Sequence, residues 1–70
     1  MAEQKRLSIN INDQTADALR EISHTKGLTI TETVRRAVSV YKFFEDELAA
    51  GRKIQTMRTG GGDKRDVELI

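Results

Sequence analysis

A strict alternation of apolar and polar side chains marks residues 6–12. Its apolar members are Leu7, Ile9 and Ile11, and its polar members are Arg6, Ser8, Asn10 and Asn12. A period of two residues indicates a strand with one buried face. The first 50 residues contain no other clean strand, and a lone strand leaves its backbone N–H and C=O groups unpaired. We therefore expect this strand to pair antiparallel with the same strand of a second copy, about a two-fold axis.

The segment that follows predicts a helix over about residues 14–26. Apolar side chains recur there at helical spacing, at Ala16, Leu19 and Ile22. Asn12 or Asp13 is suited to cap the first turn, since both side chains can accept a hydrogen bond from a free backbone amide. Gly27 is suited to the left-handed position that ends a helix.

A second, longer helix is predicted over about residues 30–50. Thr29 and Glu32 have the spacing of a capping box, and Gly51 follows the helix. A broad apolar stripe runs along it, made of Val34, Ala37, Val38, Tyr41, Phe44 and Leu48 and widened by Val40 and Phe43. One small chain cannot cover so much apolar surface. The helix is therefore expected to pack against its own chain and against a second copy.

The last 20 residues form a C-terminal extension, 51–70, beyond a domain over residues 1–50. Residues 52–58 and 65–70 could form a hairpin around the glycine-rich stretch 59–64. A flexible tail is the alternative. The pattern does not choose between the two.

Composition narrows the ways in which a chain of 70 residues can be stabilised. It contains no cysteine and one histidine, His24, which excludes disulfides, thiolate metal sites and a histidine-based metal cluster. Oligomerisation is the remaining means of support for so short a chain. We expect no metal and no cofactor. We also expect no enzyme activity, because the sequence offers no cysteine nucleophile and no histidine with a matching carboxylate.

Hydropathy and charge bear on location and partners. No apolar run approaches the roughly 20 residues that a membrane helix requires, so we expect a cytoplasmic protein without a membrane partner. The net charge is only +1. Both ends of the chain carry a basic excess and the middle is mildly acidic. A basic end indicates nucleic-acid binding better than a basic total does.

In order and spacing, these elements resemble the ribbon-helix-helix (Arc/MetJ/CopG-like) family of bacterial and phage DNA-binding proteins. Two stretches carry the likeness: Lys5 to Ile11 resembles the family's strand, and Gly27 to Glu32 resembles its turn into the second helix. The resemblance covers roughly residues 4–50, and its motifs are short. It implies a mainly α fold, an intertwined homodimer with an intermolecular antiparallel two-stranded ribbon.

The same resemblance implies how the protein binds DNA. The outward residues of the ribbon, Arg6, Ser8 and Asn10, would contact base edges in the major groove. Arginine pairs with guanine, asparagine pairs with adenine, and serine donates or accepts. Phosphates would be held by Lys5, Thr29, Ile30 and Thr31, near the start of the second helix. The implied dimer core is Leu7, Ile9, Ile11, Leu19, Ile22, Val34, Ala37, Val38, Tyr41 and Phe44.

These observations predict a sequence-specific double-stranded DNA-binding homodimer, acting as a transcriptional repressor. Three alternatives stay open. In an antitoxin-like protein, residues 51–70 would bind a partner protein. In an architectural, partition or recombination protein, several adjacent DNA sites would be bound cooperatively. A purely structural dimerisation module would bind no nucleic acid.

Overall fold

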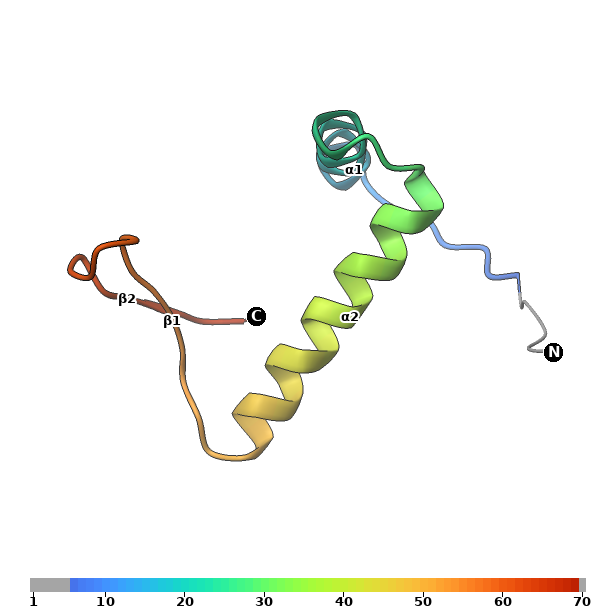
Figure 1. Ribbon diagram of the computed structural model, residues 1–70. Coiled ribbons are helices and arrows are strands. Elements are labelled where there is room, and N and C mark those ends of the chain that lie inside the picture. Colours follow the sequence, from blue (N-terminus) through green and yellow to red (C-terminus); the bar gives the residue numbers. More distant parts are fainter. Residues whose placement is uncertain (1–5, 70) are drawn as a thin grey trace, which may run out of the picture. The chain divides into compact units, whose positions relative to one another are not determined.

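The computed structural model describes residues 6–69, which form two helices and a two-stranded antiparallel sheet (Figure 1). The elements are α1 (Asp13–Lys26), α2 (Ile30–Ala49), β1 (Ile54–Thr56) and β2 (Arg65–Val67). The chain divides into two compact units, one up to Val34 and one from Arg35. Over the described range, neither helix combines the length and the apolar character needed to cross a membrane.

Helix α1 is capped at both ends by residues suited to those positions. The Asn12 side chain accepts a hydrogen bond from the Thr15 amide at 2.8 Å, so α1 begins at Asp13, one residue before the predicted start. Gly27 is left-handed, with φ of 65°, and the amides of Gly27 and Leu28 donate to carbonyls of the last turn. A residue with a side chain would be strained there, which explains the glycine.

The start of α2 is joined to α1 by a buried pair of hydroxyls. Thr29 caps α2 by accepting from the Glu32 amide at 3.0 Å. The Thr33 hydroxyl donates to the Thr29 carbonyl at 3.0 Å, so it accepts from the Ser23 hydroxyl, 2.7 Å away. Ser23 and Thr33 are the two buried residues of the described chain. Their polar atoms satisfy one another, so burying them leaves no unpaired donor.

The C-terminal extension forms a hairpin, so the structure shows the ordered alternative of the two considered for these residues. β1 and β2 pair antiparallel, with Ile54 opposite Val67 and Thr56 opposite Arg65. The paired strands have three residues each, fewer than the segments predicted. The turn is closed by the Gly61 amide, which donates to the Arg58 carbonyl at 2.8 Å.

No hydrophobic side chain between residues 6 and 69 is fully buried. Ile54 and Val67 of the hairpin are half-buried, and they line a groove of about 650 Å³ with Phe43 and Phe44 of α2. These apolar side chains thus border an open groove and are not buried in a core. Residues 6–69 of a single copy therefore form no sealed core.

Residues 6–12 belong to no helix and no strand in the single chain. The sheet of the described residues contains β1 and β2 alone. A ribbon formed by residues 6–12 needs a second copy of the chain, so the strand expected there stays a prediction. Residue Lys5, expected to contact phosphate, lies outside the described residues.

Candidate nucleic-acid interface

The apolar side chains of residues 6–12 line a groove together with the start of α2. The residues lining this groove of about 460 Å³, the ribbon groove, are Leu7, Ile9, Ile11, Ile30, Thr31 and Val34. Every second residue of the N-terminal segment takes part, and the residues between them do not. The two-residue period of the sequence is therefore also present in space, without a paired strand.

The polar side chains of the same segment are directed elsewhere. Arg6, Ser8 and Asn10 are exposed and do not line the ribbon groove. In the described part of the chain, none of the three takes part in a hydrogen bond or an ion pair. The N-terminal segment thus carries three exposed side chains whose donors and acceptors are free for an external ligand. A guanidinium, a hydroxyl and an amide are the groups that read base edges in DNA.

The start of α2 supplies a second set of donors beside the ribbon groove. The first amides of a helix have no acceptor within it, which applies here to Ile30 and Thr31. Both residues are exposed, and both line the ribbon groove. The Thr29 hydroxyl accepts from the Glu32 amide, so its own proton remains available to an anion. The positive end of the helix dipole favours such an anion.

The residues expected in a dimer core are largely uncovered in the single chain. Exposed fractions are 82% for Leu7, 68% for Ile9, 61% for Val38 and 52% for Tyr41. Ile11, Ile22, Val34 and Ala37 are also exposed, whereas Leu19 and Phe44 are half-buried. Covering one such large side chain contributes about 1.5–3 kcal/mol. These residues therefore form a large apolar surface that is exposed to solvent in the single chain.

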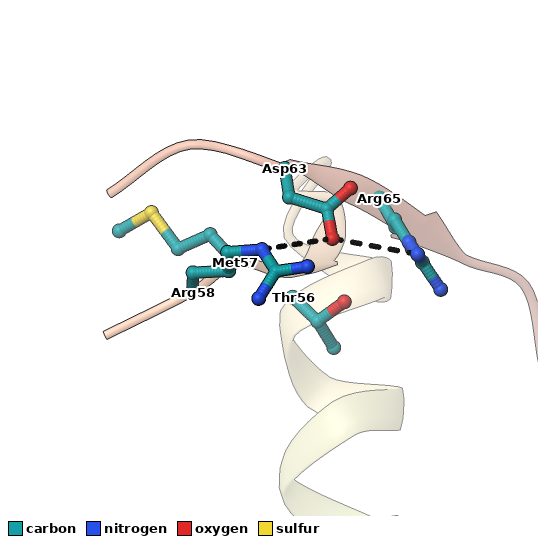
Figure 2. A pocket seen from close by; sticks show the side chains of 5 residues that line it. All are labelled: Thr56, Met57, Arg58, Asp63 and Arg65. Carbon is teal, nitrogen blue, oxygen red and sulfur yellow. Dashed lines mark hydrogen bonds and ion pairs between the residues drawn. The ribbon is translucent and has the colours of Figure 1, made fainter. Parts of the chain in front are cut away.

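Phe44 has a neighbour that the sequence did not indicate. It lines the groove shared with Ile54 and Val67 of the hairpin, within its own chain. The sequence signal was weak, because the two hairpin residues are separated by a turn and pair only once β1 and β2 are in register. The tip of the hairpin holds Arg58, Asp63 and Arg65, which line a hollow with Thr56 and Met57 (Figure 2).

Comparison with known proteins adds no identification. No protein-family model matches the chain, and no curated protein or solved structure matches it significantly.

Proposed function

We propose that this chain binds double-stranded DNA sequence-specifically as a ribbon-helix-helix homodimer and acts as a transcriptional repressor. The ribbon groove carries this proposal. Leu7, Ile9 and Ile11 of the N-terminal segment line it, and the polar side chains between them do not. A strand with one sealed face and one face of base-reading groups is what a major-groove ribbon requires.

The homodimer follows from what the single chain leaves unpaired. Residues 6–12 have no strand partner among the described residues, and their apolar face is only partly covered. An antiparallel pairing with the same residues of a second copy would satisfy the backbone groups of both chains. It would also bring two sets of apolar side chains over two ribbon grooves. With two-fold symmetry, a single interface would pair the backbone groups and cover the apolar side chains of both chains.

In this proposal, readout and positioning are separate tasks. Arg6 and Asn10 carry the specificity, because each can form two hydrogen bonds to one base. Ser8 has a short side chain and would reach a base through water. The amides of Ile30 and Thr31, with the Thr29 hydroxyl, would hold a phosphate and fix the register of the ribbon.

The decisive experiment measures the affinity of two variants for a duplex selected from a random pool and for random duplexes. Arg6→Ala and Asn10→Ala should each weaken binding to the selected duplex by about 5- to 150-fold, which corresponds to about 1–3 kcal/mol. Binding to random duplexes should change much less. Arg20→Ala is the matched control, since Arg20 is an exposed arginine on α1 that pairs with Asp17 at 2.9 Å. It should leave both affinities close to those of the original chain.

Two outcomes would contradict the proposal. One is an equal loss on selected and random duplexes, which would reduce Arg6 and Asn10 to non-specific contacts. The other is a chain that binds no duplex even at low salt, where release of counterions favours any protein that contacts phosphates.

An antitoxin-like role for residues 51–70 has less support. Such a role is typical of a tail that folds on its partner protein. Here β1 and β2 already pair within the single chain, and the Gln55 side chain donates to Asp66 across the strands at 2.7 Å.

A further inference from the structure

The tip of the hairpin, residues 57–65, holds two arginines on one carboxylate. Asp63 Oδ2 lies 3.5 Å from Arg58 Nε and 3.4 Å from Arg65 Nη2. Figure 2 shows Asp63 between the two guanidinium groups, with Thr56 beside them. These residues and Met57 line a hollow of about 270 Å³. Both arginine side chains are more than 70% exposed.

These ion pairs leave most of each guanidinium group unused. Arginine has five N–H donors, and the contact with Asp63 engages one nitrogen of each side chain. Exposed pairs at this separation contribute little to stability. Their effect is to hold two planar groups close together, with their remaining donors accessible. Such a pair of groups suits the oxygens of a phosphate.

The charge at the tip points to an anion. It has three cationic side chains, Arg58, Lys64 and Arg65, against the single carboxylate of Asp63. The next acidic residue, Asp66, is engaged by Gln55 through the hydrogen bond at 2.7 Å. Because strand side chains alternate, Asp66 projects from the face opposite to that of Arg65. An excess of two positive charges therefore remains on a segment of nine residues.

The backbone of the tip is fixed before any ligand arrives. The Arg58 amide donates to the Gly62 carbonyl at 3.0 Å, which adds to the turn bond made by Gly61. Gly61 and Gly62 have φ of 91° and 86°, values that glycine adopts without strain. A preformed tip loses little conformational entropy on binding.

We propose that this hairpin tip is a second DNA contact, in which Arg58 and Arg65, with Lys64 beside them, bind the phosphodiester backbone. The proposal rests on the DNA binding proposed above and extends it to the C-terminal extension. The contact is to phosphate, so it raises affinity for every duplex and carries no sequence information.

The test follows the salt dependence of binding to a fluorescently labelled duplex of random sequence, by anisotropy. The variant is Arg58→Gln with Arg65→Gln in the full-length chain. Each phosphate contact contributes about 0.9 to the slope of log affinity against log salt concentration. The double variant should lose about 2 from that slope. It should also bind more weakly at low salt.

The matched control removes the same two charges elsewhere. Arg20→Gln with Lys42→Gln takes away two exposed cations, each paired with one aspartate on its own helix. Its salt slope should equal that of the original chain. A second variant, Arg58→Lys with Arg65→Lys, retains the charge and should retain most of the slope.

Three results would overturn the proposal, and they can be told apart. If the original chain binds DNA and the Arg58/Arg65 glutamine variant retains its slope, the tip contact alone is wrong. If the lysine variant loses as much slope as the glutamine variant, the loss is structural and the tip makes no charge-based contact. If the original chain binds no duplex, the proposed DNA binding fails and the tip contact fails with it.

Discussion

The hairpin of residues 54–67 contains two strands that pair with each other, whereas residues 6–12 have no strand partner among the described residues. Both stretches have apolar side chains that line a groove with α2, at its start for residues 6–12 and near its end for the hairpin. β1 finds its partner within the chain, because a turn returns the backbone antiparallel to it. Residues 6–12 lead directly into α1, and no strand of the described residues pairs with them.

The alternation of apolar and polar residues therefore predicts which face of a strand is buried. It does not predict which strand pairs with it. A paired strand needs another set of backbone donors and acceptors within hydrogen-bonding distance. In the hairpin, the turn that contains Gly61 and Gly62 brings β2 alongside β1, so the partner comes from a nearby part of the chain. Residues 6–12 have no such partner among the described residues, and in the proposed dimer a second copy of the chain supplies it.

The largest effect is expected from Ile9→Asp. If Ile9 is sealed over the ribbon groove in the dimer, a carboxylate there loses the apolar contact and is buried without a partner. We expect a cost of at least about 3 kcal/mol per chain and loss of the dimer. Sedimentation equilibrium measures the association, and denaturant unfolding at several protein concentrations measures the stability.

Ser8→Asp is the control for this change, because Ser8 lies on the exposed face of the same segment. It should remain a dimer while losing affinity for DNA. Dimers of Ile9→Asp as tight as those of the original chain would show that residues 6–12 are not part of the interface.

An intermediate effect is expected in the hairpin from Gly62→Val. Gly62 has φ of 86°, which a β-branched residue adopts only with strain, at a cost of about 1–3 kcal/mol. A two-stranded hairpin has little stability to spare, so its amides should exchange with solvent faster. Hydrogen exchange over residues 54–67 measures this, and the change should not depend on protein concentration.

Gly60→Val is the matched change in the same turn. Gly60 does not have a positive φ, and no atom lies within 4 Å of the position its side chain would begin from. Exchange in the hairpin should be almost unchanged. Equal acceleration by both substitutions would show that the left-handed backbone at Gly62 does not hold the turn.

The smallest effect is expected from Gln55→Ala. It removes the side-chain hydrogen bond to Asp66 across the strands, at an exposed pair. Cross-strand pairs of this kind contribute about 0.2–1 kcal/mol. Hydrogen exchange in the hairpin should rise only slightly, and less than for Gly62→Val. A larger rise than that would place the main support of the hairpin in this pair and not in its turn.

The sequence by itself determined the local features of this protein. The Asn12 cap, the left-handed Gly27 and the Thr29 cap follow from side-chain chemistry within a few residues, which is why the helix ends could be placed closely. The alternation of residues 6–12 likewise determined which side chains line the ribbon groove and which do not.

Only the tertiary structure decided the contacts between distant residues. It selected the hairpin over a flexible tail, set Ile54 opposite Val67, and placed both over Phe43 and Phe44. It also paired the hydroxyls of Ser23 and Thr33, which the sequence did not mark. Such contacts depend on register and on the packing of separate elements. Many pairings of these residues satisfy the same apolar pattern, and packing in three dimensions selects one of them.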